Sequence, residues 1–257
     1  MTEVLYAPNR EIVVTTNAWA FLHWLRMVRG VDLAGWAPLQ QYSVDKPVDF
    51  RLAVAAFAGL SDEIERHPAP APGLPGAGGS HRNAPSRDAA AISAAAPDRP
   101  QIDLSRTALL RPLADTLLHA DVRPDDRLLV AGAVWPWRAA ELLGAAVVIA
   151  PAAAVLLTTV ATVRATILVA EATTLAETAF RRPSHRPDLS NLRTIIATGG
   201  PLSPEGRRRI YTWVKSDVML LARTGDTFWG NPLEPVLAQP PATPAFLTPP
   251  PSGPAIR

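Results

Sequence analysis

The first 60 residues carry apolar positions with the period of a helix. Apolar side chains recur every three residues from Trp19 to Val28, which places them along one face. Residues with capping side chains precede this run, and Gly30 follows it at a position where glycine commonly ends a helix. The pattern predicts a helical unit over residues 1–60. Its expected helices cover residues 15–28 and 45–60, and a short helix or turn is expected over residues 32–42.

Strand-like and helix-like segments alternate between residues 101 and 236. Short apolar runs are followed by runs with helical spacing, which is typical of parallel β-α units. In such sheets ligands bind beyond the carboxyl ends of the strands. The sequence therefore predicts an α/β core. Its expected strands cover residues 127–131, 145–150, 165–170, 192–197 and 218–222, and its expected helices cover 104–118, 137–143, 155–164, 175–182 and 204–214.

Two stretches lack apolar periodicity. Residues 67–100 contain seven Pro and four Gly, and residues 237–257 contain seven Pro in 21 positions. Such segments offer little apolar surface to bury. We therefore expect a Pro/Gly-rich linker over residues 61–100 and a disordered Pro-rich tail over residues 237–257.

One uncharged run has the length of a membrane-spanning helix. Residues 142–163 contain no charge over 22 positions. Pro151 interrupts the run, and its seven Ala and three Thr contribute little to insertion. A buried strand, a turn at Pro151 and a helix explain the run equally well. We favour that interpretation and keep a membrane-associated protein as an alternative.

Composition narrows the classes of function. The net charge of +2 does not indicate nucleic-acid binding. The absence of Cys excludes disulfides, thiol nucleophiles and Cys-ligated zinc, and the five His show no metal-ligand spacing. Lys46 and Lys215 are the only lysines. The N-terminus lacks the features of a signal peptide, so a cytoplasmic location is expected.

Three stretches carry more specific patterns. The first, within residues 1–60, has Trp24-Leu25, Ser43-Val44 and Asp49-Phe50 in that order. The second is DVRPDDRLLVAGAVWPWRAAELLGAAVVI. The third is DLSNLRTIIATGGPLSPEGRRRIYTWVKSDVMLLARTGDT, followed by GNPLEPV. Together they resemble the acetoacetyl-CoA synthetases, which are AMP-forming acyl-CoA ligases, over about residues 1–60 and 91–236.

The resemblance implies part of the N-terminal domain of an adenylate-forming ligase. In that family ATP activates a carboxylic acid to an acyl-adenylate, and CoA then displaces AMP. ATP, Mg²⁺, CoA and a small acid such as acetoacetate are therefore implied as cofactors and partners. The resemblance places the metal ligand at Asp226 and the acyl pocket at Trp135. It places nucleotide binding at Thr198, Gly199, Gly200, Pro201, Thr224, Gly225 and Thr227.

The chain departs from the family pattern at the phosphate loop. By register this loop falls on residues 93–100, which contain no Gly and carry Asp98 where phosphate would lie. Arg99 could supply charge but not a backbone cradle. In the later loop Asp226 precedes Thr227 instead of following it. The printed sequence also has no counterpart of the family's C-terminal domain and its lysine.

Two functions remain open on these grounds. One is an acetoacetyl-CoA synthetase-like ligase with impaired or no full activity alone, because losing each phosphate-holding group costs about 10²–10³ in rate. The other is a non-catalytic binding protein, a partner of a full-length synthetase or the relic of its gene. An ordinary glycine turn at Gly199-Gly200 and a solvated Asp226 are the simpler alternatives for these sites.

Overall fold

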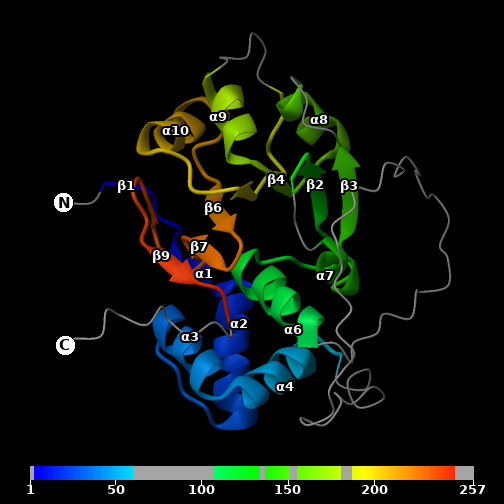
Figure 1. The fold of residues 1–257 in the computed structure, drawn as a ribbon, viewed down its shortest axis with the longest axis vertical. Helices are drawn as coiled ribbons and strands as arrows, with labels where there is room; N and C mark the ends of the chain where they lie inside the picture. The colour runs from blue at the N-terminus through cyan, green and yellow to red at the C-terminus, as the bar shows by residue number, and fades with distance from the viewer. Residues whose placement is uncertain (1–2, 61–106, 134–136, 151–154, 181–186, 247–257) are drawn as a thin grey trace, which may run out of the picture.

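The computed structural model describes residues 3–60, 107–133, 137–150, 155–180 and 187–246. They form a central sheet, helices that cover its two faces, and a layer of N-terminal helices beside it (Figure 1). The expected linker over residues 61–100 lies outside the described residues, and so do Trp135 and the expected phosphate-loop segment 93–100.

The central sheet is mostly parallel, as the sequence predicts. Five parallel strands are joined at one edge by two antiparallel strands. In spatial order the strands are β3 (Ala146–Ala150), β2 (Arg127–Ala131), β4 (Ile167–Glu171), β5 (Thr194–Thr198), β6 (Met219–Thr224), β7 (Thr227–Trp229) and β9 (Ala242–Pro244). Every position of β5 is buried, which is typical of a parallel strand covered on both faces.

Successive strand residues fill two separate cores. On one face Leu129, Leu168 and Ile195 pack with helices α8 (Leu156–Val163) and α9 (Ala172–Phe180), and with the helix formed by α10 (Pro204–Arg209) and η3 (Ile210–Val214). On the other face Leu128 and Ile167 pack near α7 (Trp137–Leu142). This alternation follows from the two-residue period of a strand, and it fixes the faces of the sheet.

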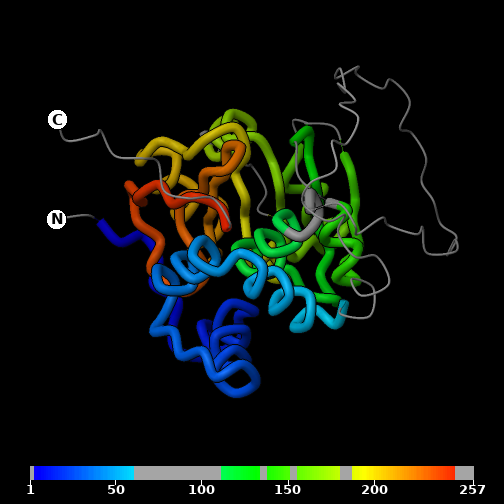
Figure 2. Tube along the Cα trace, turned by 60° about the horizontal axis from the view of Figure 1, so that its bottom comes forward, coloured from blue at the N-terminus to red at the C-terminus, as the bar shows by residue number. Residues whose placement is uncertain are grey.

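The N-terminal helices form a layer of their own beside the sheet (Figure 2). Their aromatic and aliphatic side chains pack against one another and against the helix that precedes β2. Thr16 Oγ1 accepts a hydrogen bond from the Trp19 backbone N–H and caps α2, and Gly30 ends the next segment with φ 67°. The N-terminal elements are α1 (Arg10–Val14), α2 (Asn17–Trp24), η1 (Leu25–Arg29), α3 (Trp36–Asp45) and α4 (Pro47–Phe57). The helix that precedes β2 consists of α6 (Thr107–Ala114) and η2 (Asp115–His119).

The prediction of a disordered tail from residue 237 is wrong for its first ten residues. Strand β8 (Val236–Leu237) pairs with β1 (Val4–Tyr6), and β9 extends the central sheet. Phe246 is fully buried among the N-terminal helices. Proline is compatible with this arrangement because β9 lies at the edge of the sheet, where one side of the strand needs no N–H donor.

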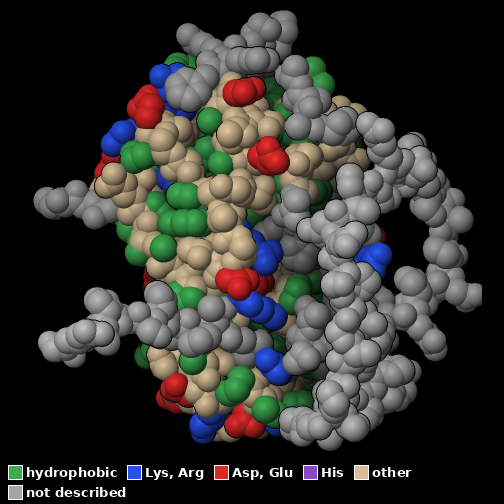
Figure 3. Space-filling model, viewed as in Figure 1, with side chains coloured by type: hydrophobic (Ala, Val, Ile, Leu, Met, Phe, Trp, Pro, Cys, Tyr) green, Lys and Arg blue, Asp and Glu red, His purple; other side chains and the backbone are tan. Residues whose placement is uncertain are grey.

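The uncharged run over residues 142–163 contains strand β3 and helix α8, as the favoured interpretation predicts. No helix within the described ranges is both long enough and apolar enough to span a membrane. On the face shown in Figure 3, basic and acidic side chains lie in small neighbouring groups among the described residues.

Candidate functional site

Two turns lie next to each other at the carboxyl ends of neighbouring strands. Strands β5 and β6 run in parallel with Thr198 opposite Arg223, so the turns that follow them meet at one edge. A Cβ placed on Gly200 would lie 3.8 Å from Thr224 Oγ1. The structure thus brings the predicted positions after β5 close to those after β6. Open α/β sheets bind ligands at this edge.

The first turn follows β5 and depends on two glycines. Gly199 has φ 80° and Gly200 has φ 141°, which are conformations that other residues rarely adopt. Thr198 is buried, and its Oγ1 donates a hydrogen bond to the Ala170 carbonyl at 3.4 Å. A Cβ at Gly199 would meet no atom within 4 Å, so the backbone here is open to a flat ligand. The same geometry would also serve an ordinary strand-to-helix turn.

The second turn joins β6 to β7 as a tight hairpin. Thr224 and Thr227 are paired across it, which leaves Gly225 and Asp226 as its two central residues. Gly225 has φ 53°, as the first central position of such a turn requires. Both central residues are exposed, and so is Thr224. The two hydroxyls and the turn backbone can therefore donate hydrogen bonds to a ligand at this edge.

Helix α6 and segment η2 bring charged side chains to the second turn. An Arg111 guanidinium nitrogen lies 2.6 Å from Asp226 Oδ1. Asp115 is fully buried, and its Oδ2 lies 3.9 Å from a guanidinium nitrogen of Arg223. Arg111, Asp115 and Arg223 are not among the residues that the sequence predicts for the site. The available signal was the four-residue spacing of Arg111 and Asp115, which places opposite charges on one helix face.

Burial shifts the pKa of several side chains in this region, and it lowers that of Arg223. Burial raises the pKa of Asp115 to about 7, against the opposing attraction of Arg223 and Arg111. Burial also lowers the pKa of His119 well below its ordinary value, and the positive charge of Arg223 adds to this effect. The His119 ring stacks on Phe228 with its centroid 3.9 Å away. His119 is therefore a neutral part of the core behind the hairpin.

Asp226 is the carboxylate that the resemblance assigns to Mg²⁺. The described residues contain no group of three or more His, Cys, Asp or Glu placed to hold a metal ion. Asp226, the predicted ligand, is paired with Arg111, whereas Mg²⁺ requires several oxygen ligands in octahedral geometry. The metal-binding role of Asp226 stays a prediction. The assignment of Trp135 to an acyl pocket also stays a prediction, because that residue lies outside the described ranges.

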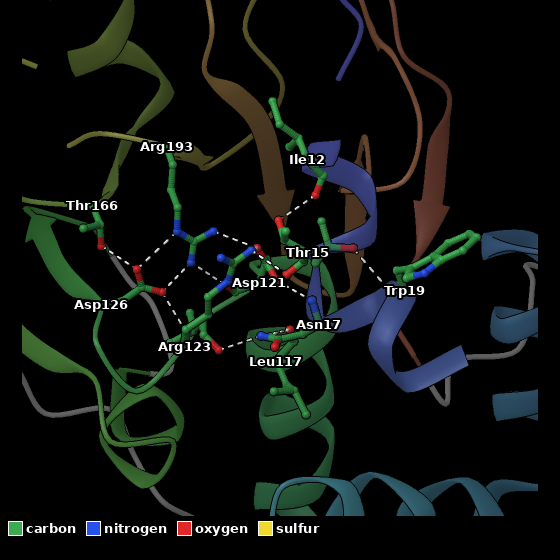
Figure 4. A network of polar contacts seen from close by, with 12 residues as sticks. Ile12, Thr15, Asn17, Trp19, Leu117, Asp121, Arg123, Asp126, Thr166 and Arg193 are labelled. Carbon is green, nitrogen blue, oxygen red and sulfur yellow. Dashed lines mark hydrogen bonds and ion pairs between the residues drawn. The ribbon is translucent and has the colours of Figure 1, made fainter. Parts of the chain in front are cut away.

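A second polar cluster lies at the opposite, amino-terminal ends of the strands (Figure 4). Arg193 bridges Asp121 and Asp126, with one nitrogen 2.8 Å from Asp121 Oδ2. The Asn17 backbone N–H donates to Asp121 Oδ1 at 2.6 Å, and Arg123 pairs with the same carboxylate. The cluster borders a cavity of about 310 Å³. Since these charges bind one another, we assign the cluster to joining the N-terminal helices to the sheet.

Comparison with known proteins identifies relatives of part of the chain. No family model matches it. Acetoacetyl-coenzyme A synthetase of Rhizobium meliloti (strain 1021) is 45% identical over 60 residues, which are 21% of this chain and 9% of that enzyme. Among solved structures, acetoacetyl-CoA synthetase from Streptomyces lividans is similar with a TM-score of 0.46 and 19% identity, over 55% of this chain and 25% of that one.

An anthranilate CoA ligase solved with anthranoyl-AMP is similar with a TM-score of 0.38 and 21% identity, over 45% of this chain and 24% of that one. The chain therefore matches only a small part of the length of each relative. The resemblance to acetoacetyl-CoA synthetases that the sequence predicts is thus confirmed for part of the chain.

Proposed function

We propose that the chain binds an adenine nucleotide at the two adjacent turns and does not complete the acid–CoA ligase reaction alone. One observation carries the proposal: the glycine turn after β5 and the hairpin after β6 meet at the carboxyl edge of a parallel sheet. The open backbone at Gly199 suits contact with a flat purine ring, and Thr224 and Thr227 offer hydroxyl donors.

The incomplete reaction follows from the groups that would hold the β- and γ-phosphates. A phosphate cradle needs several backbone N–H groups from a glycine-rich loop together with a cation. The segment 93–100 contains no Gly and carries Asp98. At the hairpin, Asp226 is paired with Arg111. The nucleotide should therefore be held through its adenosine part, and the terminal phosphates should add little affinity.

Calorimetric titration of the purified protein with AMP and with ATP tests this proposal. We expect the two dissociation constants to agree within about threefold, with no dependence on Mg²⁺ or acetoacetate, since a missing contact contributes no free energy. No thiol should be consumed when ATP, acetoacetate and CoA are supplied together. ATP binding that is tenfold or more tighter than AMP binding, and that requires Mg²⁺, would instead support an active ligase.

Thr224→Val provides the matched variant for the hairpin. Loss of one hydrogen bond of about 1 kcal/mol should weaken AMP binding about fivefold. Thr162→Val is the control, because Thr162 lies on α8 and its hydroxyl donates to the Thr158 carbonyl at 2.9 Å. No heat of AMP binding by the folded wild-type protein would refute nucleotide binding. That outcome would favour a non-catalytic binding protein. The exposed side chain of Ile149 on the edge strand β3 is compatible with association of this kind.

A further inference from the structure

Two opposite charges on one helix face approach the β6–β7 hairpin. Arg111 lies in the last turn of α6, and Asp115 begins η2 four residues later. Arg111 pairs with Asp226 at 2.6 Å, and Asp115 lies 3.9 Å from Arg223. Each helix charge thus meets an opposite charge of the hairpin.

Arg223, the partner of Asp115, also contacts the turn itself. Its Nε donates a hydrogen bond to the Gly225 carbonyl at 3.0 Å, and its guanidinium lies 5.3 Å from the centre of the Phe228 ring. Arg111 meanwhile contacts the carboxylate of Asp226. Both central residues of the turn are therefore contacted by an arginine. The two threonines that flank them are paired across the hairpin, so the same contacts fix their positions.

Of the two charged residues on the helix, Asp115 is the buried one. Its side chain is fully buried, and Oδ1 accepts a hydrogen bond from the Phe246 backbone N–H at 3.4 Å. The charged groups that face it are Arg223 from β6, Arg111 from its own helix, and Asp226 from the turn. Burial, opposed by the two arginines, raises the pKa of Asp115 to about 7. Its negative charge, and with it the attraction for Arg223, is therefore lost as the pH falls through neutrality.

We propose that Arg111 and Asp115 are positioning residues that hold the 224–227 turn in its ligand-binding conformation, and that the hold through Asp115 weakens in mildly acidic solution. The inference rests on the proposed function, since it concerns the nucleotide site named there. Neither residue needs to contact the nucleotide. Their effect passes through the carboxylate of Asp226 and through Arg223 to the turn.

Hydrogen exchange tests, without any ligand, whether Arg111 and Asp115 stabilise the 224–227 turn. Protection of the amides of residues 222–229 is compared at about pH 8 in the wild type, Arg111→Gln and Asp115→Asn. We expect both variants to lose protection there by about threefold to tenfold. Arg26→Gln is the control, because its pair with Asp32 is exposed and distant from the hairpin. Arg111→Gln keeps the test valid if Asp115→Asn does not fold, since Arg111 is 29% exposed. Unchanged protection in the folded variants would overturn the inference.

AMP titration across the range from about pH 6 to about pH 8.5 tests the link to binding. We expect wild-type affinity to fall about fivefold toward the acid end, and Asp115→Asn to bind weakly at every pH because it mimics the protonated acid. An equal pH dependence in both proteins would overturn the role of Asp115. Absence of AMP binding by the wild type would instead overturn the proposed function and any positioning role in it. The exchange data would still report separately whether the charges hold the turn.

Discussion

Replacing His119 with Leu removes a fully buried imidazole from the core behind the hairpin. Neither ring nitrogen has a hydrogen-bond partner among the described residues. The ring stacks on Phe228 at 3.9 Å and meets Trp36 edge-on at 4.4 Å. The two unpaired nitrogens together cost about 2–6 kcal/mol, while the two lost ring contacts together cost about 1–3 kcal/mol. We therefore expect His119→Leu to raise the free energy of unfolding by about 1–3 kcal/mol near pH 7.5.

The stability gained by the His119→Leu substitution should be larger in acidic solution. Because burial lowers the folded-state pKa of His119 well below 6.5, the neutral ring contributes stability that is lost as the pH falls through 6.5. Each pH unit below that value costs up to about 1.4 kcal/mol, so the difference between variant and wild type should widen by up to about 2 kcal/mol near pH 5. Asp115, whose pKa is raised, has the opposite pH dependence. It is present in both proteins, so its contribution cancels in the difference.

Urea unfolding followed by tryptophan fluorescence at several pH values measures this difference. His23→Leu is the control, because His23 is exposed on α2 and its replacement should change stability by no more than about 0.5 kcal/mol. A His119→Leu variant that is less stable than wild type near pH 7.5, with no widening toward pH 5, would refute the reasoning. It would mean that the ring nitrogens are bonded in the folded protein.

Two further substitutions test contacts that build the fold. Arg193→Met should lower the free energy of unfolding by about 3–5 kcal/mol in urea titration, because it leaves Asp121 and Asp126 buried without their shared cation; a loss below about 1 kcal/mol would contradict the role assigned to this cluster. Thr16→Ala should cost about 1 kcal/mol in the same assay through loss of the α2 cap, while Thr16→Ser should retain most of it. Equal losses for Ala and Ser would show that the hydroxyl does not cap the helix.

The parallel part of the sheet could be predicted from the sequence because its strands and helices are marked by residues that are close together in the chain. The apolar run at residues 127–131 coincides with β2, and the glycine after residue 29 ends the helical segment that starts at Asn17. A buried parallel strand has a continuous run of apolar residues, and a helix commonly ends at a residue in the left-handed conformation. Each of these features occupies only a few adjacent positions in the sequence. The alternation of such runs then suffices to predict the sheet.

The edge of the sheet and the charged contacts were not predictable in the same way. Strand β9 lies in a Pro-rich segment whose composition is typical of disorder, and only its pairing with β7 gives it a structure. Phe246 is buried by helices that lie about 200 positions earlier in the chain. Asp115 and Arg223 resemble ordinary surface charges until the fold places them together. The two turns were located because glycines mark them, whereas the four-residue spacing of Arg111 and Asp115 does not reveal which charges of the hairpin they meet.

The pairing of β1 with β8 has a consequence for synthesis on the ribosome. Val4 lies opposite Leu237, and Phe246 packs against Trp36 and Phe50 with ring centroids about 5 Å apart. The first helices can therefore form early, but their core stays incomplete until residue 246 has emerged. Contacts between positions so distant in sequence slow folding. In a nascent chain of this topology, Trp36 and Phe50 lack their contact with Phe246 until then, and apolar surface left uncovered in this way favours aggregation during that interval.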